Sequence, residues 1–355
     1  MKNFIAILIV ASIWNGCQSP THKTNPEPVL LPDSTGLTNN FYDNEPTIEL
    51  PMVTLKVDGE IANPGTVDFS VLPLHSVIVK EANLNTDGTN AFVGAYRYDG
   101  YSLYDILNSV ILKKKNAEEF PPIIDLYVEV SNDNGEKVIF SWGEIYYPNH
   151  THQILIAKSV MRIVPSKTKD LWPLPETSKL VVANDLLTAR NISNPTTITV
   201  KSLDAVYEVQ KGLSPMYCES FKLIAEDGSE KIISGITKEI QPLTYHTIFY
   251  GRGRGIHSTT PFTGYMVKQV LAPYFGFTHE NIQKGLFVFA GLDGYRVAIS
   301  YSELFNRNDQ SEFLLLIDAN DNEGGKFKVF PACDFFSDRA VKSLMEVRFI
   351  KVILM

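Results

Sequence analysis

The chain has 355 residues, a formal net charge of −8 and 20% charged residues. A length of this order predicts two or three domains, and a hydrophobic content of 44% supplies a core that needs no disulfide staples. The acidic balance argues against the basic surface that a phosphate backbone attracts, so we expect no nucleic-acid partner. After the first residues no apolar run is long enough to cross a bilayer, and we expect no integral membrane domain.

The first 17 residues have the pattern of an export signal. Lys2 supplies a short positive region, and residues 4–14 form an apolar stretch that is short for a membrane span. The pair Gly16-Cys17 that follows resembles the bacterial lipoprotein box. This resemblance implies that residues 1–17 are a lipoprotein signal peptide and that Cys17 is lipidated and holds the protein to a membrane. The alternative is a secreted protein with an incidental cysteine.

Residues 18–51 are rich in Pro, Thr, Asn and Asp and show little apolar periodicity. This composition predicts a solvated, flexible tether between the lipid and the folded body. Gln18 and Ser19 follow the cysteine in place of an acidic retention signal. The lipoprotein resemblance then implies a location in the cell envelope, on the outer membrane and facing the periplasm or the surface.

The remaining sequence reads as two copies of one unit, residues 52–201 and 202–355. The clearest match is between residues 183–192 and 332–341, where Ala, Asp and Arg are identical and the apolar and hydroxyl positions agree in type. The Asp and Arg recur as Asp185 with Arg190 and as Asp334 with Arg339. Because both copies keep the pair, we interpret it as architecture, a turn capped by Asp and closed by Arg.

Other elements recur in the same order along both copies. Each copy has a Gly-Tyr turn that leads into a short amphipathic helix, then a strand, a hairpin turn with Asn-Gly or Asp-Gly, and a second strand that ends before a glutamate expected to cap a short helix. A further apolar strand follows.

The first copy also has extra residues at 159–178, which we interpret as a loop or hairpin insertion. The matched features are the turns at Gly100 and Gly264, the strands 126–130 and 286–290, the capping residues Glu144 and Glu303, and the strands 153–157 and 313–317. We therefore predict an α+β fold that is rich in short strands and has few short helices.

The order of elements resembles the molybdopterin-binding domain of sulfite oxidase-like oxidoreductases. In the first unit the resemblance rests on the opening strand and turn at residues 55–65, on Phe69-Ser70-Val71-Leu72-Pro73 and on residues 98–107. In the second unit it rests on Asp293-Gly294-Tyr295. The resemblance implies two tandem units of this family's fold, and by the same implication molybdopterin is the cofactor to consider.

Chemistry in that family depends on a cysteine thiolate that binds molybdenum, because a soft sulfur ligand tunes such a centre. The resemblance places this cysteine within a stretch that corresponds here to residues 80–92 and 244–260, and neither stretch contains one. Cys333 lies near the end of its unit and Cys218 near the opening strand, where they pair once or stay buried. The fold therefore does not carry the activity with it, and we expect no cofactor.

The most unusual segment is Tyr250-Gly251-Arg252-Gly253-Arg254-Gly255-Ile256-His257. Glycines allow the backbone to approach a ligand closely, two arginines grip an anion, and the histidine titrates near neutrality. Arg252, Arg254, Gly253, Gly255 and His257 are therefore candidate ligand-binding residues for an anionic small molecule. The alternative is an exposed loop with solvated charges.

Two other groups of side chains invite a functional interpretation. Tyr101 is the candidate from a set of four tyrosines near the Gly100 turn that lines either a ligand cleft or the core. His150 and His152 would place two imidazoles on one face of a strand, but no Cys, Asp or Glu nearby in the sequence completes a metal shell. We predict an exposed loop pair there and no metal site.

These features together favour a non-catalytic envelope lipoprotein that binds an unknown anionic small molecule or an envelope protein. The alternative is a molybdopterin-dependent oxidoreductase with a nonstandard metal site, located in the second unit at the Gly251–His257 loop. A third class is an assembly partner of a larger envelope complex.

Overall fold

The computed structural model describes residues 45–205, 207, 209–210 and 212–352. The predicted signal peptide, Cys17 and residues 18–44 of the predicted tether lie outside the described residues. The end of that tether has regular structure, because Ile48 in strand β1 (Ile48–Glu49) pairs with Val160 of β8 (Ile154–Arg162). All the described residues belong to one compact unit.

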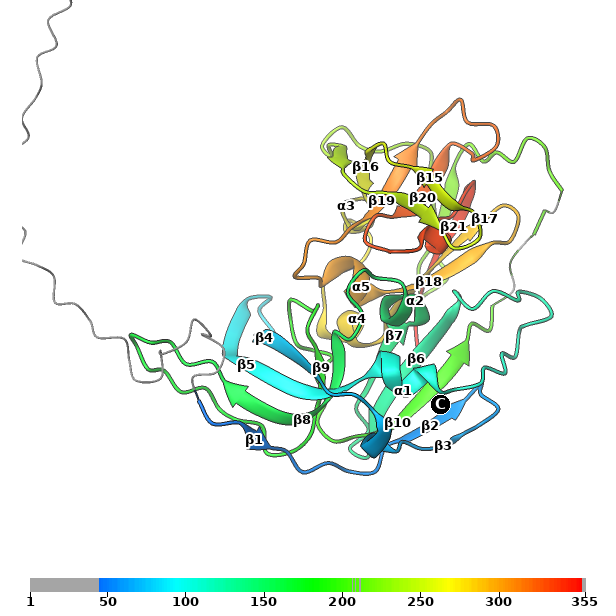
Figure 1. Ribbon diagram of the computed structural model, residues 1–355. Helices are drawn as coiled ribbons and strands as arrows, with labels where there is room; N and C mark the ends of the chain where they lie inside the picture. Colours follow the sequence, from blue (N-terminus) through cyan, green and yellow to red (C-terminus); the bar gives the residue numbers. More distant parts are fainter. Residues whose placement is uncertain (1–44, 206, 208, 211, 353–355) are drawn as a thin grey trace, which may run out of the picture. The chain divides into compact units, whose positions relative to one another are not determined.

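A five-stranded sheet in the first half has the order β3-β2-β10-β6-β7 (Figure 1). Strand β10 runs parallel to β2 and antiparallel to β6, and the short β6–β7 hairpin closes one end of the order. The strands are β2 (Lys56–Gly59), β3 (Gly65–Thr66), β6 (Leu126–Asn132), β7 (Lys137–Ser141) and β10 (Pro195–Ser202). The predicted strand over residues 126–130 is thus confirmed within β6.

The second half contains a sheet of the same design, with the order β12-β11-β21-β17-β18. Here β21 runs parallel to β11 and antiparallel to β17, as β10 does with β2 and β6. The strands are β11 (Phe221–Ile224), β12 (Glu230–Ile233), β17 (Gly285–Gly291), β18 (Arg296–Ser300) and β21 (Leu344–Lys351). Strand order and strand direction therefore repeat between the halves.

Each half also has an antiparallel sheet. In the first half β4 pairs β5, β5 pairs β8, and β8 also pairs β9; in the second half the order is β13-β16-β19-β20. The hairpin β14–β15 is inserted between β13 and β16. The remaining strands are β4 (His75–Leu84), β5 (Asn90–Ser102), β9 (Leu180–Val182), β13 (Leu243–Tyr245), β14 (Phe249–Gly251), β15 (Gly255–Ser258), β16 (Phe262–Met266), β19 (Phe313–Ile317) and β20 (Phe327–Pro331).

The helices are few and short, which confirms the predicted β-rich α+β class. They are α1 (Leu103–Asn108), α2 (Trp142–Tyr146), α3 (Val267–Leu271), α4 (His279–Lys284) and α5 (Tyr301–Phe305), with 3-10 turns η1 (Phe69–Val71) and η2 (Ser337–Arg339). Ser141 caps α2 and Glu144 returns a bond to the Ser141 amide, which is a capping box. Ser300 caps α5 in the same way, but the Glu303 carboxylate instead accepts a bond from the Ser141 hydroxyl. The predicted capping role is therefore confirmed for Glu144 alone.

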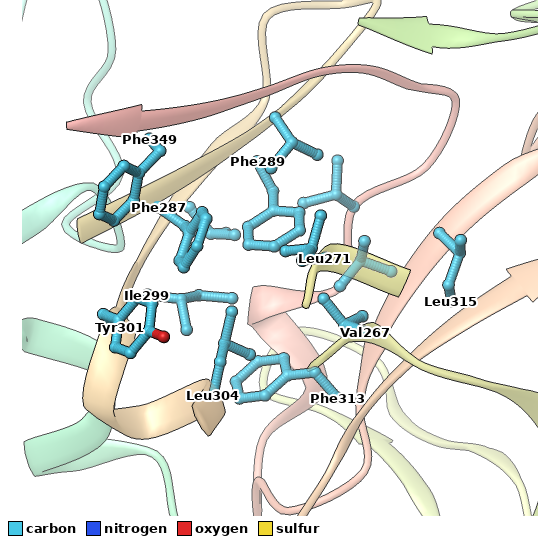
Figure 2. Close-up of a cluster of buried hydrophobic side chains, with 14 of the residues drawn as sticks. Val267, Leu271, Phe287, Phe289, Ile299, Tyr301, Leu304, Phe313, Leu315 and Phe349 are labelled. Carbon is cyan, nitrogen blue, oxygen red and sulfur yellow. The ribbon is translucent and has the colours of Figure 1, made fainter. Parts of the chain in front are cut away.

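Aromatic side chains fill the core of the second half (Figure 2). Phe287 on β17 is fully buried, and its ring centroid lies 4.8 Å from that of Phe349 on β21. Val267 and Leu271 of α3 pack into the same cluster together with Phe313 of β19. The apolar side chains on one face of the strands and those on one face of the one-turn helix α3 therefore pack into one core.

The predicted insertion at residues 159–178 begins too early. Strand β8 continues to Arg162, and its last residues pair with β5, for example Arg162 with Tyr96. The segment that follows has no regular structure until β9, but it is tied back, since the Trp172 indole donates to the Ile163 carbonyl at 3.1 Å. The extra residues therefore lie against β5 and the end of β8 as a loop.

The two halves meet at a junction with paired contacts. Pro148 forms a β-bridge with Asp334, and Asp185 forms one with Arg307. The amide of Phe335 donates to the Tyr147 carbonyl at 2.7 Å, and the amide of Leu186 donates to the Asn306 carbonyl at 2.6 Å. Each half thus offers the other an equivalent pair of segments, as in the interface of a twofold dimer.

Candidate functional site

The glycine- and arginine-rich segment forms the β14–β15 hairpin. Gly255 has a φ of +77°, a conformation that side chains rarely adopt. Side chains alternate between the two sides of the hairpin, as a strand requires. On one side Phe249 and His257 line a pocket of about 330 Å³, and their rings stack with centroids 4.6 Å apart. On the other side Tyr250 and Ile256 line a larger cavity.

The predicted arginines border the smaller pocket. Arg252 and Arg254 are both exposed, and Gly253 lies between them at its rim. The Arg252 amide donates to the Asp338 carboxylate at 3.3 Å, and its guanidinium Nε lies 3.9 Å from the other oxygen. Because 63% of the Arg252 side chain is exposed, its ion pair with Asp338 contributes little to stability. Lys342 and Asp293 also line the pocket, so its charge is mixed and an anion site there stays a prediction.

Tyr101 is not part of this region. It lies on β5, is buried in the core of the first half, and packs against Phe69 with ring centroids 4.7 Å apart. Among the two alternatives for the tyrosine group, the structure favours core packing for this residue.

A cavity of about 710 Å³ is lined by segments from both halves of the chain. The first half contributes residues 148–150 and Asn184, and the second half contributes residues 245–248, Tyr250, Ile256, Arg307, Asp309, Ser311 and 332–335. Among these, Ile248, Tyr250, Ile256 and Phe335 are large apolar side chains that stay exposed. A concave site lined by aromatic and aliphatic side chains with a few polar groups is typical of a small-molecule site.

The charged groups around this cavity are mostly neutralised in pairs. The Arg307 Nε donates to the Asp309 carboxylate at 2.8 Å. Burial alone would raise the pKa of Asp309, but the bond and the charge from Arg307 hold this pKa below its usual value. Asp334 is paired with Arg339, whose Nε and Nη2 each lie 2.7 Å from one of its oxygens. His150 and His246 are further polar groups on the cavity wall.

Cys333 also lines the cavity, although its position near the end of its unit does not match that of the cysteine that binds molybdenum in the family it resembles. It follows β20, which pairs with β19, and β19 pairs with β16 beside the hairpin. The thiol is 6% exposed and donates to the Asp334 carboxylate at 3.6 Å. Burial, and then Asp334, raise the pKa of Cys333 well above its usual value. Burial and the neighbouring carboxylate therefore both disfavour the thiolate form of Cys333, which is the form that binds a metal.

Each half has a group of buried ion pairs close to the junction, where Asp185 and Asp334 also form the bridges between the halves. Arg190 binds Asp185 and Glu144, and Arg339 binds Asp334 and Glu303, all with side chains at most 5% exposed. Burial raises the pKa of Glu144 to about 7, with Arg190 opposing the rise and Glu303 adding to it. The burial of these groups agrees with the architectural interpretation of the two Asp and Arg pairs. In each half a glutamate from the first turn of a helix joins the pair.

The two ion-pair groups are linked across the junction. The Ser141 hydroxyl donates to the Glu303 carboxylate at 2.8 Å, although the two residues are 162 positions apart. Arg190 in turn donates to the Ser300 hydroxyl at 3.4 Å, and Arg339 donates to that of Ser141 at the same distance. Gly143 permits this arrangement, because a Cβ there would collide with the Arg339 side chain. Each arginine therefore contacts the helix cap of the other half.

A second cluster was missed by the sequence analysis. His75 Nε2 lies 2.7 Å and His152 Nδ1 3.3 Å from the same oxygen of Asp105. The two imidazoles stack with centroids 3.9 Å apart and an interplanar angle of 10°. Burial, and next the neighbouring His75, lower the pKa of His152. Two imidazoles and a carboxylate make up a donor set that metal ions use.

The sequence pointed to one member of this cluster. His152 was considered with His150, but His150 lines the large cavity and is not in the donor set. His75 and Asp105 lie far from His152 in the chain and meet it only because β4 pairs β5 and β5 pairs β8. The prediction that no acidic residue completes a shell was made from sequence neighbours alone, and Asp105 occupies that position in space.

No helix among the described residues is both long and apolar enough to span a membrane. A comparison of the chain with models of known protein families and with curated proteins finds no match.

Proposed function

We propose that the protein is a cell-envelope lipoprotein, held to a membrane through Cys17, that binds a small ligand without transforming it. Two sulfite oxidase-like units, one in each half, would supply its scaffold. The repeated strand order and directions support the two-unit interpretation, and the Gly16-Cys17 pair supports the anchor.

The observation that carries the binding proposal is the cavity of about 710 Å³ at the junction. Its apolar wall would receive a ring or chain, and His150 and His246 would meet an acidic group. Because Asp309 and Asp334 are each paired with an arginine, neither carboxylate repels an anion strongly. The ligand class is therefore a small molecule that combines an apolar ring with an anionic group.

An aromatic anion tests this proposal directly. The dye 1-anilinonaphthalene-8-sulfonate is expected to bind the full chain and to fluoresce, and Ile256→Asp is expected to weaken binding at least about tenfold, because it removes apolar contact worth roughly 1.5–3 kcal/mol. Fluorescence titration gives the dissociation constants. Ile111→Asp is the matched control, since Ile111 is 62% exposed and Ile256 68%, but only Ile256 lines the cavity. Equal binding by both variants would contradict a site in the cavity.

One observation favours a second function, a molybdopterin-dependent oxidoreductase. Cys333 lies on the cavity wall, so the chain does place a sulfur near a site of adequate size. We expect elemental analysis of the purified full chain to find no stoichiometric molybdenum and no pterin fluorescence in the extract, because residues 80–92 and 244–260, which correspond to the stretch that holds the family's ligand cysteine, contain none. One molybdenum per chain, lost in Cys333→Ser and kept in Cys218→Ser, would replace the binding proposal with this one.

A further inference from the structure

We propose that His75, Asp105 and His152 form a binding site for a divalent transition metal, with Zn²⁺ the ion that fits best. The site is separate from the ligand cavity and does not depend on the function proposed above. The donor atoms are His75 Nε2, His152 Nδ1 and an Asp105 carboxylate oxygen, and all lie within 4.8 Å of one another.

The donor spacing agrees with a tetrahedral ion. Ligand atoms about 2.0–2.2 Å from zinc are separated from each other by about 3.3–3.6 Å in a tetrahedron. The Asp105 oxygen lies 3.3 Å from the His152 nitrogen, which fits this spacing, and 2.7 Å from the His75 nitrogen. Binding an ion would therefore widen the second separation by about 0.6–0.9 Å and turn the stacked imidazoles toward the ion. Two nitrogens among three donors favour zinc and its neighbours over Mg²⁺ or Ca²⁺, which take oxygen ligands.

The neighbouring side chains hold the donors in place, as the outer shell of a metal site does. The Ser102 hydroxyl donates to the Asp105 carboxylate at 2.6 Å and lies 3.0 Å from His152 Nδ1. The Tyr104 ring packs edge-on against the His152 imidazole, with centroids 4.9 Å apart. Tyr146 of α2 packs in turn on Tyr104. The cluster is therefore supported from both α1 and α2.

The backbone of His152 is held in an uncommon conformation. Its φ is 63°, in the left-handed region that non-glycine residues seldom occupy. Such strain persists where the surroundings impose it, and it is concentrated at functional sites. This conformation lets the imidazole of His152, a loop residue, stack on the imidazole of His75, the first residue of β4.

The site is open to solvent and leaves a coordination position free. The side chains of His75, Asp105 and His152 are 26%, 16% and 31% exposed, so an ion reaches them without unfolding. Three protein ligands on a tetrahedral ion leave the fourth position to water or to another molecule, which distinguishes such a site from closed structural zinc.

The donor set belongs to the first half only. The matching turn of the second half has Met266 where the first has Ser102, and Gln269 where the first has Asp105. Helix α3 has no side-chain cap, and its Lys268 pairs with Glu312. Residues that both halves keep, such as the buried Asp and Arg pairs, serve the architecture, whereas this cluster is not needed to build the unit.

Equilibrium dialysis of the purified full chain against Zn²⁺ tests the site. We expect one tightly bound ion per chain, with affinity at least about 100-fold lower in each of His75→Gln, Asp105→Asn and His152→Asn, since even supporting residues of metal sites cost 10–100-fold when lost. Asparagine is chosen at position 152 because it tolerates a positive φ. Bound Zn²⁺ should also raise the melting temperature of the wild type and not of the variants.

His279→Gln is the matched control, because His279 is an exposed histidine outside both the donor set and the ligand cavity. It should keep the wild-type affinity, and all four variants should melt near the wild type when no metal is present. Absence of stoichiometric binding, or equal affinity in the three site variants and the control, would overturn the proposal and leave a hydrogen-bonded cluster of structural role only.

Discussion

Replacing Arg339 by alanine is expected to lower the free energy of unfolding by about 3–5 kcal/mol, because it leaves buried carboxylates without a counter-charge. The arginine is fully buried, holds both oxygens of Asp334 at 2.7 Å, and lies 2.6 Å from Glu303. Urea unfolding followed by circular dichroism measures the loss.

Two further variants make this result interpretable. Arg339→Lys keeps the charge without the planar fork, so it should retain part of the stability if the alanine variant does not fold. Lys222→Ala breaks the exposed pair with Glu230 and should change the unfolding free energy by less than about 1 kcal/mol. Similar values for Arg339→Ala and Lys222→Ala would show that a buried ion pair contributes no more to the stability of this protein than an exposed one.

Replacing Cys17 by serine is expected to move the protein from the membrane pellet to the soluble fraction. In a lipoprotein the acyl chains on this cysteine are the attachment, and each buried methylene contributes about 0.8 kcal/mol. The described residues offer no helix that would replace the anchor. Fractionation of cells, with intact-mass measurement of the purified protein for the added lipid, checks the prediction.

Cys218→Ser is the control for this experiment, because Cys218 is a free, partly buried cysteine in the folded part of the chain. It should stay in the membrane pellet with the lipid mass intact. Retention of Cys17→Ser in the pellet, or an unprocessed mass for the wild type, would remove the lipoprotein proposal and leave the cavity and the metal site unaffected.

Local sequence patterns were sufficient for much of the fold. The strand Phe313–Ile317 has the predicted ends, because an apolar run of five residues is bounded by polar turns. The helix that begins after Ser141 was predicted from Glu144. A glutamate three positions after the capping residue bonds back to it within one helical turn. These elements depend on residues close in the chain, so their signals are visible in the sequence.

The sites depended on contacts that sequence spacing does not reveal. His75 lies 30 positions from Asp105 and 77 from His152, and only the register of β4 on β5 and of β5 on β8 brings them together. Cys333 reaches the cavity through the pairing of β20, β19 and β16. A one-residue slip in any of these ladders would reverse the side chains, so the sites could not be derived before the register was known.

The junction between the halves also sets an order of events during folding. Ser141 bonds to Glu303, and Arg339 reaches back 198 positions to the same serine. Contacts of such separation form late, since a long loop must close first. When only the first half of the chain has left the ribosome, Glu144 and Arg190 therefore lack the second-half residues that surround them in the folded protein. We expect the N-terminal half to wait in an immature state until the last strands are synthesised.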